Sequence, residues 1–205
     1  MNLFSFIESE MQAAGIPGLA YAIVVDGEIR QMGARGVVRQ GSDQAVTPDT
    51  GFVSGSIAKS FTALAVMQLV EAGKVDLDTE ISDYLAGFSG QPAGVITIRQ
   101  LLSHTSGWST FQGNLSHEDE GPHQDALARR VNRAAGEVPA YRPGERWEYS
   151  NLNYQILGRL IEVVGEQTYQ TYVNTHILQP IGMTHSFVAD GQSHEGMASG
   201  HRPWF

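Results

Sequence analysis

The stretch Ser54-Gly55-Ser56-Ile57-Ala58-Lys59-Ser60, SGSIAKS, places a lysine at the start of a predicted helix that is nearly apolar all round. A helix of that kind, here Ser56 to Gly73, is normally buried. Ser56 and Lys59 are three residues apart, so their side chains share one face and can touch. The positive end of the helix dipole and burial both disfavour a charged ammonium here. The stretch therefore predicts a neutral lysine amine beside a serine hydroxyl.

A neutral amine beside a hydroxyl can serve as a general base for a nucleophile. Serine is a weak nucleophile until a base takes its proton, and such assistance is typically worth about 10² to 10⁴ in rate. The structural alternative is that Ser56 caps the helix and Lys59 extends its aliphatic stem to solvent. Because Ser-x-x-Lys is a short motif with many chance occurrences, these residues alone leave both interpretations open.

A second candidate group is Tyr149-Ser150-Asn151, which follows the turn Arg142-Pro143-Gly144 and directly precedes a predicted helix. From such a position, a phenol and an amide could project toward the serine and lysine. The phenol could relay protons, and the amide could hold a substrate carbonyl. Taken alone, Tyr149 is better explained as a core aromatic and Asn151 as an ordinary N-cap.

The rest of the chain predicts a strand hairpin followed by helices. Leu19 to Val25 is apolar like a strand, Asp26-Gly27 is a two-residue turn, and Glu28 to Gly36 is the returning strand. A helix with Leu3, Ile7 and Met11 at helical spacing precedes the hairpin and stops at Gly15. Further helices are expected at 97–102, where Thr97 is the cap, at 126–135, after Asn151, and around 169–178, with an exposed loop at 113–125 and no clear element at 189–205.

Composition excludes several classes of function. The formal charge of −9 and the pI near 5.1 disfavour nucleic acid and anionic membrane surfaces as partners. The chain has no cysteine, so disulfides and Cys-based sites are excluded. The cluster from His117 to His123 lacks metal-ligand spacing, so we expect no metal and no cofactor. The N-terminus does not resemble a signal peptide, which predicts a soluble, cytoplasmic protein unless a signal was removed before residue 1.

Several segments, in order, resemble the serine β-lactamase and penicillin-binding-protein-like hydrolases, in particular the class C β-lactamase, D-aminopeptidase and esterase branch. The resemblance implies an α+β fold of the β-lactamase/transpeptidase type. It further implies that Ser56 is the acylated nucleophile, Lys59 its base, Tyr149 the proton relay and Asn151 a substrate-binding amide, with the His104 run as structural support. The matching segments are Gly15-Ile16-Pro17-Gly18, Ser56-Ile57-Ala58-Lys59, Leu101-Leu102-Ser103-His104-Thr105-Ser106-Gly107, Pro143-Gly144 with Tyr149-Ser150-Asn151, and Pro180-Ile181-Gly182-Met183.

One family motif is not found. Members carry Lys/His-x-Gly on a later strand that supplies an oxyanion-hole amide; here His194-Glu195-Gly196 matches only formally, in a stretch without a strand pattern. We therefore expect residues 1–205 to be the N-terminal portion of such a domain, with a helix and hairpin at 1–55 and a mostly helical region at 56–205. The unpaired hairpin edge is expected to self-associate or to accept a complementing C-terminal chain.

The expected activity is hydrolysis through an acyl-enzyme. The acyl donor is a small molecule: an ester, a β-lactam or a D-amino-acid amide, and the sequence does not choose among them. Because losing an oxyanion donor usually costs about 10² to 10³ in rate, the chain is expected to be a weak catalyst or none. The alternative is a non-catalytic fragment or inactive homologue that binds a partner or self-associates.

Overall fold

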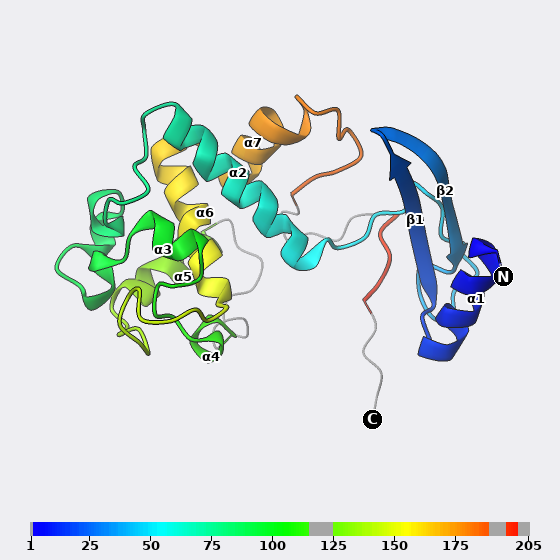
Figure 1. Ribbon diagram of the computed structural model, residues 1–205, viewed down its shortest axis with the longest axis horizontal. Helices are drawn as coiled ribbons and strands as arrows, with labels where there is room; N and C mark the ends of the chain where they lie inside the picture. The colour runs from blue at the N-terminus through cyan, green and yellow to red at the C-terminus, as the bar shows by residue number, and fades with distance from the viewer. Residues whose placement is uncertain (1, 115–124, 189–195, 201–205) are drawn as a thin grey trace. The chain divides into compact units, whose positions relative to one another are not determined.

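The computed structural model describes residues 2–114, 125–188 and 196–200, which form two compact units (Figure 1). One unit comprises Met1–Ser54 with Ser193–Phe205, and the other comprises Gly55–Gln192. The first contains a helix and a strand hairpin, and the second is helical. The α+β class predicted from the sequence is therefore confirmed.

The first unit begins with α1 (Leu3–Ala14), which Asn2 caps by accepting a 2.9 Å hydrogen bond from the Ser5 amide. Strands β1 (Gly18–Val25) and β2 (Glu28–Gly36) pair antiparallel, with Gly18 opposite Gly36 and Val25 opposite Glu28. Both turn residues have positive φ, 52° at Asp26 and 78° at Gly27, which is the geometry that matches strand twist in a two-residue hairpin. The predicted hairpin is confirmed, including its turn.

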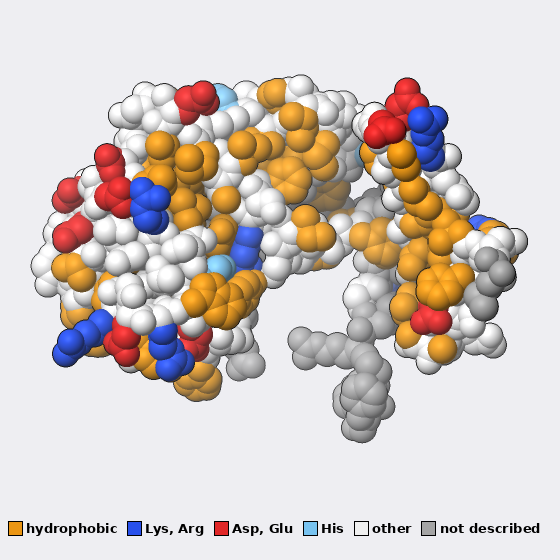
Figure 2. All heavy atoms as spheres, in the orientation of Figure 1, with side chains coloured by type: hydrophobic (Ala, Val, Ile, Leu, Met, Phe, Trp, Pro, Cys, Tyr) orange, Lys and Arg blue, Asp and Glu red, His pale blue; other side chains and the backbone are white. Residues whose placement is uncertain are grey.

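The half of this hairpin that contains the turn carries exposed apolar side chains. Val24, Ile29 and Met32 are 58%, 62% and 58% exposed, although strand residues of this type usually pack against a neighbouring layer. Figure 2 shows hydrophobic side chains gathered along the two strands. Among the strands of the described residues, β1 and β2 pair only with each other, so their outer edges are open to a further strand except at Gly36, whose carbonyl accepts from the Val46 amide at 2.9 Å.

Residues 196–200 form backbone contacts with earlier residues of the first unit, and the sequence pattern did not predict this pairing. Met197 forms an isolated parallel bridge with Gly51, and the Ser199 amide donates to the Val38 carbonyl at 2.8 Å. These contacts are made by backbone groups, so they can form although residues 196–200 show no alternation of apolar side chains. Of the formal His-x-Gly match, His194 and Glu195 lie outside the described residues.

The second unit is built around α6 (Asn151–Gly165), which lies against α2 (Ala58–Glu71), α3 (Ile98–Leu102), α4 (Thr110–Asn114), α5 (Ala126–Ala135) and α7 (Tyr169–Val173). Its core is one cluster of buried apolar residues, among them Leu69, Trp108 and Leu157. The short turns are η1 (Gly55–Ile57), η2 (Ile81–Asp83), η3 (Ala86–Phe88), η4 (Pro92–Val95) and the π-helical η5 (Asn174–Leu178).

Most predicted helices of this unit are confirmed. The helix predicted at Thr97 begins with a capping box in which Thr97 and Gln100 satisfy each other's backbone amides. The predicted exposed loop 113–125 is wrong at its start, because Gly113 is buried inside α4; residues 115–124 lie outside the described part of the chain.

The helix after SGSIAKS also differs from its prediction. Ser56 lies in the turn η1, and α2 begins at Ala58. The helix is not buried all round: Thr62, Ala65, Val66 and Leu69 are buried, whereas Leu64 and Met67 are 45% and 43% exposed. Because apolar residues lie on every face of α2, the sequence alone could not show which face packs against the other helices.

No helix in the described part of the chain combines the length and apolar character needed to cross a bilayer.

The two leucines of α2 allow a matched test of which face forms the core. Leu69→Ala, at a site 3% exposed, is expected to lower the free energy of unfolding by about 2 to 5 kcal/mol because it leaves a cavity. Leu64→Ala, on the exposed face, is expected to lower it by no more than about 1 kcal/mol. Urea unfolding followed by circular dichroism measures both, and equal losses would contradict the assignment of faces.

Candidate active site

The serine and lysine of SGSIAKS meet at the start of α2. Lys59 Nζ donates to Ser56 Oγ at 3.3 Å and to Asn151 Oδ1, on α6, at 2.9 Å. Ser56 is exposed and Lys59 is half-buried. The helix-cap alternative for Ser56 is wrong, because Ile57 occupies the N-cap position. Lys59 is directed at the serine and the amide, rather than being fully buried or extended into solvent.

Tyr149 completes the group from the segment before α6. Its Oη lies 2.7 Å from Ser56 Oγ, and it donates to Asn151 Oδ1 at 3.2 Å. Since the phenol proton is used on Asn151, the serine proton is directed toward the phenol oxygen. The structure therefore brings together all four residues singled out in the sequence, with the serine hydroxyl donating toward the tyrosine and accepting from the lysine.

Asn114, which the sequence analysis did not identify, fixes the orientation of the Asn151 amide. Asn151 Nδ2 donates to Asn114 Oδ1 at 3.0 Å, which leaves Asn151 Oδ1 facing Lys59 and Tyr149. Asn151 is the first residue of α6 and Ser150 holds the N-cap position, so the N-cap alternative for Asn151 is also wrong. No local pattern marks Asn114, because its role depends on the packing of α4 against α6.

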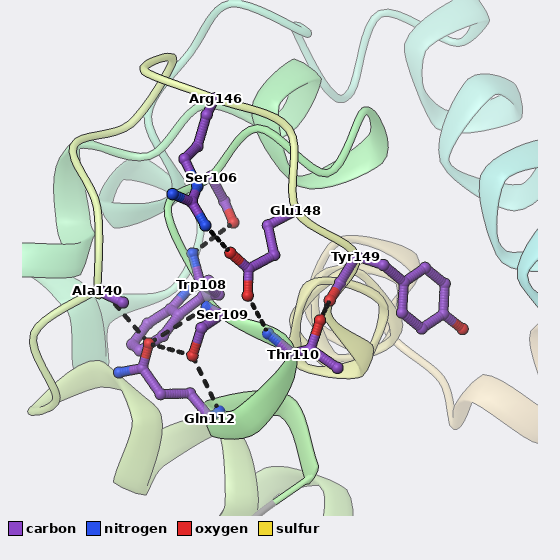
Figure 3. Close-up of polar contacts among 9 residues, drawn as sticks. All are labelled: Ser106, Trp108, Ser109, Thr110, Gln112, Ala140, Arg146, Glu148 and Tyr149. Atoms are coloured by element: carbon purple, nitrogen blue, oxygen red, sulfur yellow. Dashed lines mark hydrogen bonds and ion pairs between the residues drawn. The ribbon is translucent and has the colours of Figure 1, made fainter.

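The segment that carries Tyr149 is held by hydrogen bonds to the start of α4 (Figure 3). Thr110 Oγ1 donates to the Tyr149 carbonyl at 2.6 Å, and the Thr110 amide donates to Glu148 Oε1 at 2.8 Å. Arg146 donates to the other Glu148 oxygen at 2.6 Å. The Thr110 amide first and Arg146 second lower the pKa of the Glu148 carboxyl, so the carboxylate keeps its partners through the neutral range.

A glycine allows α4 and α6 to approach this closely. A Cβ on Gly113 would lie 2.6 Å from Ser150 Oγ and 2.8 Å from the Asn151 amide nitrogen, both too short for real contacts. Any larger residue would displace the start of α6 or α4. Since Tyr149 and Asn151 flank Ser150, the geometry of the site depends on this contact.

Lys59 and burial shift the pKa of the Tyr149 phenol in opposite directions. Burial raises its pKa, but interaction with Lys59 and Ser56, together with the Lys59 charge, outweighs burial and lowers the pKa overall. The pKa of the neighbouring Tyr154 is raised, first by burial and then by Tyr149. The phenol that touches the serine is thus the one made easier to deprotonate.

A cavity of about 440 Å³ opens beside the serine within the second unit. Among the described residues that line it, Lys59 is the one charged side chain. The Thr62 and Tyr169 hydroxyls, 2.7 Å apart, satisfy each other across part of its wall. The lining residues are Gly55, Ser56, Lys59, Thr62, Leu127, Asn151, Tyr154, Gln155, Gly158 and Tyr169.

The described residues contain no group of three histidines and carboxylates that could hold a metal ion. The histidine and carboxylate cluster at 117–123 falls outside them.

Comparison with known proteins identifies the family to which the chain is similar. The model of the Beta-lactamase family matches residues 3–202. Penicillin-binding protein 4 of Amycolatopsis lactamdurans is 40% identical over 174 residues, which cover 83% of this chain and 44% of that protein. The octameric penicillin-binding protein homologue from Pyrococcus abyssi superimposes with a TM-score of 0.74 at 32% identity, over 89% of this chain and 43% of that one. A class C beta-lactamase gives a TM-score of 0.78 at 25% identity, over 95% and 52%.

The chain therefore belongs to the Beta-lactamase family, and the fold expected from the resemblance is confirmed. It spans less than half the length of the curated relatives it matches.

The effect of Lys59 on Tyr149 is directly testable. Lys59→Met removes the interaction and the charge that lower the pKa of Tyr149, so we expect that pKa to rise. Lys74→Met, which removes the other lysine of the chain, is expected to leave it unchanged. Nuclear magnetic resonance of ¹³Cζ-labelled tyrosine, assigned with Tyr149→Phe, measures the titration. An unchanged Tyr149 pKa in Lys59→Met would contradict the electrostatic assignment.

Proposed function

We propose that this chain carries the nucleophile and the acid-base groups of a serine hydrolase that acts through an acyl-enzyme. The observation that supports this most strongly is the position of Ser56 Oγ, 2.7 Å from the Tyr149 hydroxyl and 3.3 Å from the Lys59 amine. A nucleophile within hydrogen-bonding reach of its base, with the base oriented by a third group, is the usual signature of an activated serine. Here Asn151 is that third group.

In the proposed acylation, Ser56 Oγ attacks the carbonyl carbon of the donor. Its proton passes to Tyr149 while the phenol proton passes to the unprotonated amine of Lys59, so Lys59 is the base and Tyr149 the relay. The carbonyl π electrons move to oxygen, and the Ser56 amide at the positive end of α2 stabilises the resulting oxyanion. When the intermediate collapses, the bond to the leaving group breaks and Tyr149 delivers the proton to that group. The acyl group remains on Ser56.

Deacylation repeats these steps with water as the nucleophile. As the water oxygen attacks the acyl carbon, the water proton passes to Tyr149 and the phenol's own proton passes to the unprotonated Lys59 amine. The ester bond to Ser56 then breaks. The proton returns to Ser56 Oγ, which restores the starting state. Both half-reactions need Tyr149 to pass on its proton and regain one, and the lowered pKa of its phenol favours the loss.

The cavity beside Ser56 indicates the class of acyl group. Leu127, Tyr154 and Tyr169 give it apolar walls, and its one charged lining residue in the described chain is the lysine of the site. An uncharged, mainly apolar acyl group would enter without leaving a buried charge unpaired. Esters, β-lactams and D-amino-acid amides all offer a suitable carbonyl, with Asn151 as the amide proposed to contact it, and an ester is the donor we favour.

Acylation of Ser56 is the central test. A fluorophosphonate should modify the 205-residue chain once, at Ser56, as read by intact mass and peptide mapping. Ser56→Ala should abolish the modification, and Lys59→Met should slow it by about 10² or more. Ser60→Ala, an exposed serine on the same helix, is the matched control and should react like the parent. Absence of any labelling would contradict the proposal.

We expect this labelling to be slow. The resemblance places a second oxyanion donor on a strand bearing Lys/His-x-Gly, and the described residues contain no such strand. The rate should then lie about 10² to 10³ below that of a family member with both donors. Rapid, stoichiometric labelling would contradict this expectation while supporting the assignment of Ser56.

A second candidate role is self-association through the hairpin. The exposed side chains of Val24, Ile29 and Met32 and the two unpaired strand edges favour it, and the Pyrococcus abyssi homologue forms an octamer. The proposed occupant of this face is a second copy of the chain. A complementing C-terminal chain, added as a separate polypeptide, is the competing occupant.

Light scattering after size exclusion tests the hairpin interface. The parent should form a dimer or a larger species, and Val24→Lys should shift it toward the monomer because a lysine places charge on the apolar face. Val138→Lys, at a 67% exposed valine of the other unit, is the matched control and should leave the mass unchanged. A monomeric parent, or equal behaviour of the two variants, would contradict association through this face.

A further inference from the structure

His104 contacts the Tyr149 segment in two ways. Its ring centroid lies 4.7 Å from that of Tyr149, with an interplanar angle of 33°, and 5.2 Å from that of Tyr154. Its carbonyl accepts a 2.9 Å hydrogen bond from the Glu148 amide. The imidazole therefore forms one wall against which the tyrosine ring of the candidate site rests.

A chain of hydrogen bonds sets which atoms face the imidazole. The Trp108 amide donates to Ser106 Oγ at 3.2 Å, so the Ser106 hydroxyl proton is free to donate to Asn153 Oδ1 at 2.6 Å. The Asn153 carbonyl is thus turned toward Ser106, and its NH₂ group faces His104 Nδ1 at 3.0 Å. The Trp108 amide can only donate, which fixes Ser106 Oγ as its acceptor; the direction of the bond between Asn153 and His104 depends on which ring nitrogen of His104 carries the proton.

His104 Nδ1 receives a second donor from the backbone. The Ser150 amide donates to it at 3.2 Å. Two donors converging on one ring nitrogen require that nitrogen to be a bare acceptor, so the ring proton lies on Nε2 and the imidazole is neutral. Ser106, Ser150 and Asn153 are fully buried, which means that their mismatch with a protonated Nδ1 would not be relieved by solvent.

From this arrangement we infer that His104 is a positioning residue for Tyr149 and that it works only as the neutral imidazole. The hydrogen bond from the Ser150 amide to His104 and the contact between the His104 and Tyr149 rings together hold the Tyr149 phenol beside Ser56. Protonation at Nδ1 would place three donors against one another and push the Ser150 amide, and Tyr149 with it, away from the serine. This inference rests on the role proposed above for Tyr149.

The charged and titratable groups around His104 come from several elements. Lys59 approaches from α2, Tyr149 and Glu148 from the preceding segment, and Tyr154 from α6; the Glu148 carboxylate itself binds Thr110 and Arg146. Burial lowers the pKa of His104, and the Lys59 charge lowers it further. The neutral imidazole is therefore retained below the ordinary titration range of histidine, and both the site and the fold are disfavoured as the pH falls through that range and below the lowered pKa.

The first test is structural and independent of catalysis. Nitrogen-15 resonances of the histidine rings in the full chain should show Nδ1 of His104 unprotonated and Nε2 protonated at neutral pH. As His104 gains its proton, the ¹³Cζ resonance of Tyr149 should shift with the same midpoint. A proton on Nδ1 at neutral pH, or a Tyr149 signal indifferent to His104 titration, would overturn the inference whether or not Ser56 reacts.

The second test uses the pH profile of fluorophosphonate labelling at Ser56. His104→Asn keeps an acceptor near the position of Nδ1 and a residue type that tolerates the φ of 58° found here, but it loses the ring and the titration. It should slow labelling about 10- to 100-fold at neutral pH and remove the inflection at the His104 pKa. His176→Asn, at an exposed histidine on η5, should change neither quantity. A His104→Asn profile parallel to that of the parent would overturn the inference.

A double-mutant cycle separates positioning from a general loss of structure. If His104 acts through Tyr149, His104→Asn should add little to the effect of Tyr149→Phe, and the two losses should be strongly non-additive. Full additivity, with circular dichroism showing both variants folded across the pH range, would overturn the inference. Failure of Ser56 to react in any variant would contradict the proposed function alone and leave the resonance measurement to decide on His104.

Discussion

The contact between the starts of α2 and α6 is the interaction on which the candidate site depends. Lys59 projects from the first turn of α2, and its amine bridges Ser56 and Asn151. This requires the two helices to pack through a buried core, in which Val66 and Leu69 of α2 belong to the same cluster as Ile156 and Leu160 of α6. Core packing thus sets the distance between the amine and its partners, and local hydrogen bonds set only their direction.

A second layer of contacts holds Tyr149 in place relative to those helices. Thr110 binds its carbonyl, Gly113 permits the close approach of α4, and His104 supports its ring. These contacts come from one stretch of chain that runs from His104 through α4. The run His104-Thr105-Ser106-Gly107, expected from the resemblance to be structural, therefore begins the stretch of chain that positions the phenol.

The sequence predicted features with local causes and missed those created by packing. Asp26-Gly27 implies a turn because both residues tolerate positive φ, and Thr97 with Gln100 forms a capping box within four residues. Asn114 and Asn153 carry no such local pattern, since they act on residues 37 and 49 positions away, respectively. The exposed face of α2 was missed for the same reason: its apolar residues are distributed all round, so periodicity cannot select a buried side.

The structure also separates two components of catalysis that the family resemblance joins. Ser56, Lys59, Tyr149 and Asn151 all lie in the unit Gly55–Gln192, and their hydrogen bonds close within it. The hydrogen bonds that we propose to activate the serine therefore need only that helical unit, whereas the oxyanion stabilisation implied by the family resemblance also needs a strand. A site of this kind can form all of its hydrogen bonds and still catalyse slowly, because proton transfer and oxyanion stabilisation depend on different parts of the fold.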